Sequence, residues 1–124
     1  MILLAEDDSE LRSLVARVLR EDGHEVIEAS DATELLDLIA TLGYFPSLAA
    51  VPDMILSDVR MPGGDGADIL SRLMRSERPI PFVLMTSYGD DAASAEAIEQ
   101  GASDVIEKPF RLERLRWAVR RVLG

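Results

Sequence analysis

Charged and hydroxyl side chains follow short apolar segments at four places in this sequence. They are Glu6, Asp7 and Asp8 after residues 2–5, Asp58 after residues 54–57, Thr86 and Ser87 after residues 82–85, and Lys108 after residues 105–106. Carboxylates that lie close together repel each other, and a divalent cation with oxygen ligands, such as Mg²⁺, relieves that repulsion. Phosphoryl transfer to an acid requires a metal, an ammonium group and a hydroxyl around the acceptor carboxylate. The product is an acyl phosphate.

The only lysine of the chain is Lys108, and the other basic residues are all arginine. Lysine carries a compact point charge and arginine a planar fork of donors, so the two are not interchangeable in a tight site. We interpret Lys108 as a candidate site cation, with chance and codon usage as the alternative.

The composition narrows the classes of protein to which this chain can belong. Its 124 residues allow one domain, expected to span residues 1–124, and 48% hydrophobic with 29% charged residues is a globular balance. The lack of cysteine excludes disulfides, thiolate metal sites and cysteine nucleophiles, and one histidine cannot build a multi-histidine site. The net charge of −10 argues against direct nucleic-acid binding. Without a leader or a membrane-spanning run, we expect a cytoplasmic protein with no membrane contact.

Short apolar runs alternate with amphipathic segments five times along the chain. The predicted strands are residues 2–5, 24–29, 54–57, 82–85 and 105–106, and the predicted helices run from residue 11 toward Gly23, from Asp31 to Gly43, from Asp65 toward Pro79, from Asp90 to Gly101, and over residues 112–123. Most of the strands are continuous apolar runs, which indicates burial on both faces and therefore a parallel sheet. An eight-stranded barrel requires about 250 residues. The predicted fold is therefore α/β, a doubly wound five-stranded parallel sheet in a (βα)5 three-layer sandwich.

Several motifs together resemble the receiver domain of response regulators in two-component signalling. They are ILLAEDD at residues 2–8, SDVRMPGGDG at 57–66, MTS at 85–87, GAS at 101–103 and KPF at 108–110. The resemblance covers essentially the whole chain, in matching order. It implies the chemotaxis-type, flavodoxin-like strand order 2-1-3-4-5, in which the first and third strands are neighbours. Because sites lie at the carboxyl ends of parallel strands, the chemical groups are then expected along one rim of the sheet.

The resemblance also implies a phosphoacceptor site. Asp58 would take a phosphoryl group from the phosphohistidine of a sensor histidine kinase or phosphotransfer protein and thereby switch a protein-interaction face. Thr86 would hold that group and Lys108 would form an ion pair with it. The Lys108–Pro109 bond would be cis. Such a domain helps to catalyse its own phosphorylation and dephosphorylation but is not a turnover enzyme.

A magnesium site is implied beside the acceptor. Asp7 and Asp58 would bind Mg²⁺, Glu6 would act through the waters of the metal, and the Arg60 carbonyl would be a further ligand. Asp8 falls outside the family's acidic pair, and we predict that it caps the helix that follows.

Two features depart from the family pattern. Val105 stands three residues before Lys108, where the family often has an aromatic residue that reports phosphorylation, so the mode of switching stays open. The connection from Gly43 to Asp53 exceeds the usual two to six residues. It is either a lengthened second helix that packs on its own aromatic residues or a partner-binding feature.

The resemblance implies a homodimer through the fourth helix, the fifth strand and the fifth helix. The last helix carries the arginines Arg111, Arg114, Arg116, Arg120 and Arg121. They form either a solvated face or a surface that pairs with acids such as Glu96 or Glu99 of a partner. Trp117 is either an anchor of that surface or a core residue, and His24 is predicted to lie at the surface.

Arg60 and Tyr88 each lie two residues beyond a proposed site residue. By the resemblance these places flank the water that hydrolyses the acyl phosphate, and the size of both side chains predicts slow hydrolysis. Residues 63–66 resemble a phosphate loop, but no Lys-Ser/Thr follows them. We therefore predict a flexible loop entering the third helix.

Two other functions stay open on sequence alone. A phosphatase or phosphotransferase of the haloacid-dehalogenase type also uses an aspartate nucleophile and Mg²⁺, but residues 58–60 lack its second acid. The other alternative is a protein-binding module of the same fold that is not phosphorylated.

Overall fold

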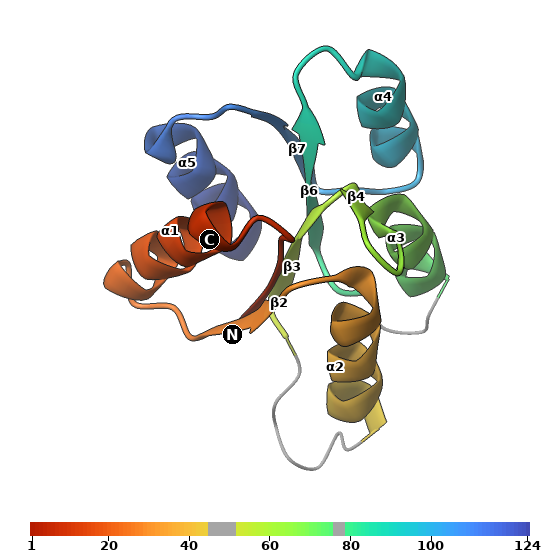
Figure 1. Ribbon diagram of the computed structural model, residues 1–124, viewed down its shortest axis with the longest axis horizontal. Helices are drawn as coiled ribbons and strands as arrows, with labels where there is room; N and C mark the ends of the chain where they lie inside the picture. Colours follow the sequence, from red (N-terminus) through yellow and green to blue (C-terminus); the bar gives the residue numbers. More distant parts are fainter. Residues whose placement is uncertain (45–51, 76–78) are drawn as a thin grey trace.

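Five parallel strands form the central sheet of the computed structural model, which describes residues 1–44, 52–75 and 79–124. The strands are β1 (Ile2–Ala5), β2 (Val26–Ala29), β3 (Met54–Asp58), β6 (Phe82–Ser87) and β7 (Asp104–Lys108). Their order in the sheet is β2-β1-β3-β6-β7 (Figure 1). Counting these five strands alone, the order is 2-1-3-4-5, so the expected fold is confirmed.

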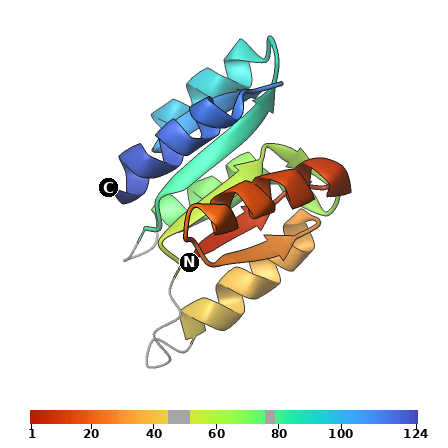
Figure 2. The same ribbon diagram turned by 90° about the vertical axis from the view of Figure 1, so that its left-hand side faces the viewer.

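Helices cover both faces of the sheet. They are α1 (Ser9–Glu21), α2 (Ala32–Tyr44), α3 (Gly66–Met74), α4 (Asp91–Glu99) and α5 (Leu112–Leu123). Helices α1 and α5 lie on one face, and α2, α3 and α4 lie on the other (Figures 1 and 2). This arrangement is the predicted three-layer sandwich.

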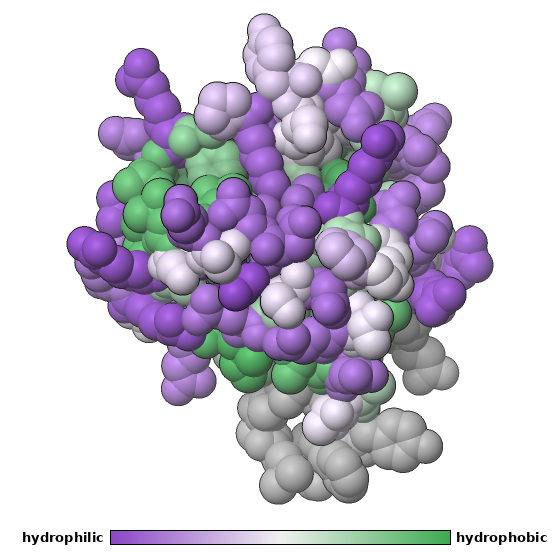
Figure 3. Space-filling view, in the orientation of Figure 1, coloured by the Kyte–Doolittle hydropathy of each residue, from purple (hydrophilic) through white to green (hydrophobic). Residues whose placement is uncertain are grey.

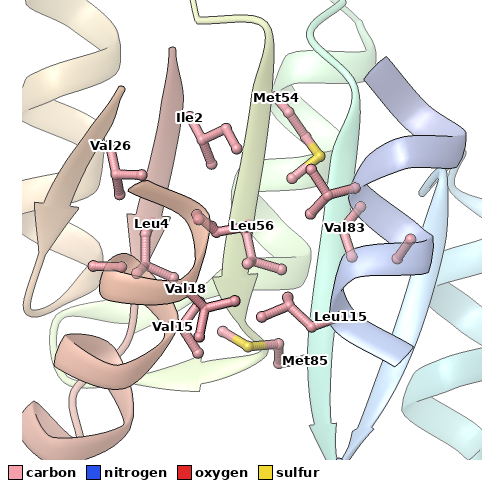
Figure 4. Packing of buried hydrophobic residues seen from close by; sticks show 14 of the residues in the cluster. Ile2, Leu4, Val15, Val18, Val26, Met54, Leu56, Val83, Met85 and Leu115 are labelled. Atoms are coloured by element: carbon pink, nitrogen blue, oxygen red, sulfur yellow. The ribbon is translucent and has the colours of Figure 1, made fainter. Parts of the chain in front are cut away.

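Each face of the sheet has its own hydrophobic core. Side chains of a strand alternate between the faces, so Ile2 and Leu4 pack toward α1 and α5 (Figure 4), whereas Leu3 packs toward α2 and α3. All residues of β1 are fully buried. Burial of each large apolar side chain stabilises the fold by about 1.5–3 kcal/mol, which explains why continuous apolar runs became the inner strands.

Aspartates begin several of the helices, as the sequence predicts. The Asp8 carboxylate accepts hydrogen bonds from the backbone N–H groups of Glu10 (3.0 Å) and Leu11 (3.2 Å), so its predicted capping role is confirmed. Asp65 accepts from the Ala67 N–H at 2.8 Å at the start of α3. Helix dipoles favour negative charge at these positions, so the caps fix where the chain leaves each strand.

The second helix ends later than predicted. The structure continues α2 to Tyr44, one residue past the expected end at Gly43. Glycine permits a helix end but does not enforce one. The long connection singled out in the sequence falls mostly on residues 45–51, outside the described residues.

A small hairpin replaces the loop predicted between β3 and α3. Strands β4 (Arg60–Met61) and β5 (Gly64–Asp65) pair antiparallel. At its turn Gly63 has φ +86°, and a Cβ there would lie 2.4 Å from Thr33 Oγ1. Strands of two residues are too short to show an alternating pattern, which explains why the sequence predicted only a flexible loop.

In the described part of the chain, none of the helices combines the length and hydrophobicity needed to cross a membrane.

Candidate functional site

Three carboxylates meet at the carboxyl ends of β1 and β3. The two strands pair in parallel with Ala5 opposite Ser57, so the acids that follow are neighbours. One carboxylate oxygen from each of Glu6, Asp7 and Asp58 lies within 4.8 Å of the others. Glu6 is buried, Asp58 is half-buried and Asp7 is exposed. The predicted convergence of these acids is confirmed.

Lys108 joins this cluster from the far side of β6. Its Nζ donates hydrogen bonds to both carboxylate oxygens of Glu6, at 3.0 and 2.8 Å, and to Asp58 Oδ2 at 2.9 Å. The peptide bond from Lys108 to Pro109 is cis, as expected. The one lysine of the chain therefore lies among the acids.

The electrostatics of the cluster follow from burial and from these contacts. Burial raises the pKa of Glu6, the hydrogen bond from Lys108 works against that rise, and the negative charge of Asp58 adds to it. Burial alone would lower the pKa of Lys108, but its hydrogen bonds to Glu6 and Asp58 outweigh this and raise it. The ammonium group therefore stays protonated, and it partly offsets the charge of the acids.

The donor set of the cluster suits a hard dication. All its ligand atoms are carboxylate oxygens, which Mg²⁺ prefers, and one or two carboxylates plus waters are its usual protein ligands. The residues therefore fit the predicted metal. The part of the Arg60 carbonyl as a further ligand stays a prediction.

Thr86 lies next to this cluster but turns its hydroxyl elsewhere. In the pairing of β3 with β6, Asp58 lies opposite Met85, so Thr86 is one residue further along the rim. Thr86 is fully buried, and its Oγ1 lies 3.5 Å from Ser94 Oγ on α4. The structure thus brings Thr86 to the predicted rim, with its hydroxyl in contact with a helix.

Sequence reasoning missed the contribution of Arg12. Its Nη1 donates a 2.8 Å hydrogen bond to the Glu6 carbonyl, and its Nε lies 3.6 Å from Glu28 Oε1. The contact holds the backbone that carries the acids. The helix dipole disfavours a cation near the N-terminus of a helix. The presence of Arg12 at such a position was therefore the signal in the sequence that its charge has a partner outside the helix.

Arg60 and Tyr88 follow β3 and β6 at exposed positions. The Arg60 side chain is 83% exposed and lies 3.8 Å from Asp90 Oδ2, and Tyr88 is 82% exposed. Their predicted effect on hydrolysis of the acyl phosphate stays a prediction.

The arginines of α5 are mostly paired within the chain. Arg114 donates to both oxygens of Asp104 at 2.9 and 3.0 Å, and Arg121 approaches the same acid at 3.7 Å. Arg116 pairs with Asp22 at 2.9 Å. Within the described residues, Arg120 of α5 and Arg111, which directly precedes the helix, form no ion pair. The last helix is therefore neither a purely solvated face nor a set of free cations.

Trp117 and His24 are two further residues singled out by the sequence. Trp117 is 55% exposed, so it is not a core residue, and the guanidinium groups of Arg114 and Arg121 lie 5.2 and 5.3 Å from its ring centroid. His24 is half-buried and precedes β2 at the end of the sheet away from the acids. The prediction that it lies at the surface and far from the site agrees with this position.

An apolar cavity of about 450 Å³ opens beside Lys108. Its apolar lining comes from α1 and from the segment that leads into α5: Leu11, Leu14, Pro109, Phe110 and Leu112. A hydrophobic area covers this part of the surface in an otherwise largely hydrophilic face (Figure 3). Leu14 is 44% exposed there, so a partner can reach apolar surface next to the acids.

Known proteins share this sequence pattern. The family model of the response regulator receiver domain matches residues 2–120. The transcriptional regulatory protein FixJ of Bradyrhizobium diazoefficiens is 35% identical over 92% of this chain, and the DNA-binding transcriptional regulator NtrC of Klebsiella pneumoniae is 33% identical over 89%. The chain spans 52% and 22% of their lengths. The sporulation initiation phosphotransferase F of Bacillus subtilis is 30% identical over 98% of this chain and 92% of its own length.

Solved structures agree with the sequence matches. The receiver domain of NtrX from Brucella abortus has a TM-score of 0.85 and 31% identity, and the match covers 99% of this chain and 98% of that one. A putative response regulator from Chloroflexus aurantiacus has a TM-score of 0.86 and 30% identity, with coverage of 98% and 95%.

Proposed function

Because this chain belongs to the response regulator receiver domain family, we propose that Asp58 accepts a phosphoryl group from a partner's phosphohistidine and thereby switches a protein-interaction surface. The observation that carries this proposal is the contact of Lys108 Nζ with Asp58 and Glu6 beside the exposed Asp7. These residues together supply an acceptor oxygen, a fixed cation and an acidic cluster in one place.

The transfer is a displacement at phosphorus. An Asp58 carboxylate oxygen forms the new O–P bond as the N–P bond of the phosphohistidine breaks. The imidazole nitrogen keeps the electron pair of that bond, and the ring takes up one proton. Lys108 Nζ donates a hydrogen bond to the accepting carboxylate, so its charge offsets the negative charge that arrives there. The Thr86 hydroxyl donates to a phosphoryl oxygen of the product.

Mg²⁺ would be held by Asp7 and Asp58 directly, by Glu6 through water, and by the Arg60 carbonyl. When bound, it supplies positive charge that offsets the charge of the transferred group. The acids of the chain position it, and the buried Glu6 also keeps Lys108 in place through two hydrogen bonds.

The donor would be a sensor histidine kinase or a phosphotransfer protein. It must bring its histidine to Asp58, and the apolar cavity beside Lys108 offers a docking surface within reach. The switched surface would be that of α4, β7 and α5, through which a homodimer can form. The acidic net charge of −10 supports a domain that does not bind nucleic acid itself.

We propose further that residues 1–124 form one receiver domain, located in the cytoplasm, that does not turn over a substrate. The alternative of a haloacid-dehalogenase-type phosphatase is less well supported, since the family model covers residues 2–120 and residues 58–60 lack a second acid.

Incubation with phosphoramidate, a small N–P donor, tests the proposal. With Mg²⁺ present, intact-mass spectrometry should detect one added phosphoryl group on the wild-type protein and none on Asp58→Asn. An unmodified wild-type protein would contradict the proposal. Sustained turnover of a generic phosphate ester would instead favour the phosphatase.

A further inference from the structure

The Thr86 hydroxyl is engaged by a helix in this structure. Thr86 Oγ1 lies 3.5 Å from Ser94 Oγ, and Ser94 Oγ in turn donates to the Asp90 carbonyl at 3.2 Å. A serine has one hydroxyl proton, and that proton serves Asp90. Thr86 is therefore the donor in its contact with Ser94, so its proton points toward α4.

Ser94 lies in the first turn of α4, close to the site. Asp90 caps this helix through the Ala93 N–H at 3.3 Å, and its carboxylate lies 3.8 Å from Arg60. Hydrogen bonds from Thr86 through Ser94 to Asp90 thus join the rim of the sheet to the start of α4.

Helix α4 is held to the sheet by little apolar burial. Of its residues only Ala97 is buried, and Ile98 is 54% exposed. The helix lies at the end of the row of helices on its face, beside β6 and β7 (Figure 1). Few buried apolar contacts make an element easy to displace, so a single hydrogen bond can bias its position.

Val105, three residues before Lys108 on β7, offers no polar substitute for this contact. Val105 on β7 carries only hydrocarbon and packs in the core of the same face. Among the described residues, Ser94 is the side chain of α4 that forms a hydrogen bond with Thr86. Coupling between the site and α4 therefore has a polar route through Ser94.

We propose that Ser94 is a positioning residue that holds the Thr86 hydroxyl in the resting state and competes with the phosphoryl group for it. This inference rests on the proposed function, because it assigns the regulation of the same site. One hydroxyl proton cannot serve both acceptors, so phosphorylation releases Ser94 and loosens the start of α4. Removal of the Ser94 hydroxyl then favours the phosphorylated arrangement, because a two-state equilibrium shifts when one state loses a contact.

The test compares Ser94→Ala with two matched variants. Ser71→Ala removes a serine hydroxyl from the neighbouring helix α3, where that hydroxyl accepts a hydrogen bond from Arg75 at 3.2 Å. Ser94→Thr keeps the hydroxyl at position 94. Two readouts apply: the χ1 rotamer populations of Thr86 in the unphosphorylated protein, from three-bond NMR couplings, and the midpoint of a titration with beryllium fluoride in the presence of Mg²⁺.

We expect Ser94→Ala to redistribute the Thr86 rotamers and to lower the beryllium fluoride midpoint by about two- to fivefold, as befits the loss of one long hydrogen bond. Ser71→Ala and Ser94→Thr should stay close to wild type. In a Thr86→Val background, Ser94→Ala should have no effect on the midpoint.

Other outcomes would overturn the inference. Unchanged Thr86 rotamers in Ser94→Ala mean that Ser94 does not hold the hydroxyl. A midpoint shift of equal size in the Thr86→Val background means that Ser94 acts only on the intrinsic stability of α4. If the wild-type protein binds no beryllium fluoride at all, the proposed function fails, and the rotamer measurement alone still decides whether Ser94 holds Thr86.

Discussion

Lys108 Nζ lies 2.9 Å from the Asp58 carboxylate although β6 separates the strands that carry the two residues. The four-carbon stem of lysine spans the intervening strand along the rim of the sheet. Because the cation is already on the acceptor, it needs little reorganisation when negative charge arrives, which is the condition for effective electrostatic stabilisation.

Loss of the Lys108 charge should destabilise the protein in the absence of metal. Lys108→Met keeps much of the side-chain volume but leaves the buried Glu6 beside Asp58 with no cation. We expect the free energy of unfolding in urea to fall by about 2 kcal/mol, less than for a fully buried pair because Lys108 is 22% exposed.

A second substitution checks the cause of that loss. Asp58→Asn should regain part of the stability in the Lys108→Met background, because it removes one of two repelling charges. In the wild-type background it should give no gain, since it also removes a partner of Lys108. The same effect of Asp58→Asn in both backgrounds would argue against the pairing.

Mg²⁺ should stabilise the folded protein through the acidic cluster. A ligand that binds only the folded state at about ten times its Kd adds roughly 1.4 kcal/mol, which thermal unfolding with increasing Mg²⁺ detects. Asp7→Asn should abolish most of this gain, and Glu10→Gln, an exposed acid outside the cluster, should retain it. Equal gains in the two variants would place the metal elsewhere.

Gly66 should tolerate no side chain. A Cβ at Gly66 would lie 2.3 Å from the backbone oxygen of Asp58, and the Gly66 N–H donates to the Val59 carbonyl at 2.6 Å. Since backbone atoms must move, Gly66→Ala should cost about 2–3 kcal/mol of stability and slow phosphorylation of the displaced Asp58.

Gly23→Ala provides the control for that substitution. Gly23 has φ +95°, and apart from its immediate chain neighbours no atom lies within 4 Å of the position that an alanine methyl group would take. Alanine there should therefore cost only about 1 kcal/mol of backbone strain and leave phosphorylation unchanged. A Gly66→Ala protein that behaves like Gly23→Ala would contradict the close approach.

The Arg114–Asp104 pair should make stability depend on pH in the acid range. Burial alone would raise the pKa of Asp104, but the hydrogen bonds from Arg114 and from the Val105 N–H and the charges of Arg114 and Arg121 lower it below the ordinary value of 3.8. Because the folded-state pKa is the lower one, the contribution is full above pH 3.8 and is lost as the pH falls through the folded value.

Arg114→Gln should therefore lower stability by about 1 kcal/mol near neutral pH, a modest figure because Arg114 is 37% exposed. The difference from wild type should shrink when urea unfolding is repeated at pH values below 3.8. A difference that is constant across this range would mean that lost packing, and not the charge pair, is responsible.

Arg60 and Tyr88 should slow the loss of the phosphoryl group by shielding it from water. Both side chains are exposed in the resting structure, so either can turn over the modified Asp58. We expect Arg60→Asn and Tyr88→Ala each to speed the decay of the phosphorylated protein a few-fold, measured after removal of the donor. Unchanged or slower decay in both variants would rule out shielding.

Elements with long apolar runs were predictable from the sequence. Burial on both faces leaves a continuous hydrophobic signal, which is why β1, β3 and β6 and the rim residues Glu6 and Asp58 could be predicted. The caps at Asp8 and Asp65 were also predictable, because a cap is a local contact between a side chain and the next helical turn.

Side-chain contacts between a strand end and the helix that follows it could not be predicted in this way. Such contacts depend on how each helix packs against the sheet. They are the ion pair of Arg114 with Asp104, the hydrogen bond from Arg12 to the Glu6 carbonyl, and the contact of Thr86 with Ser94. The strand order itself came from the family resemblance, since the helical crossovers alone allow several orders. The short hairpin was missed because its strands carry no periodic signal.

Chemical trapping of the modified residue identifies the aspartate that carries the phosphoryl group. An acyl phosphate on aspartate is reduced by borohydride to homoserine, which peptide mass spectrometry locates. After phosphorylation with phosphoramidate and Mg²⁺, we predict homoserine at position 58 and at no other aspartate. Homoserine at Asp7, Asp8 or Asp65, or a phosphorylated protein that yields none, would contradict the assignment of Asp58 as the acceptor.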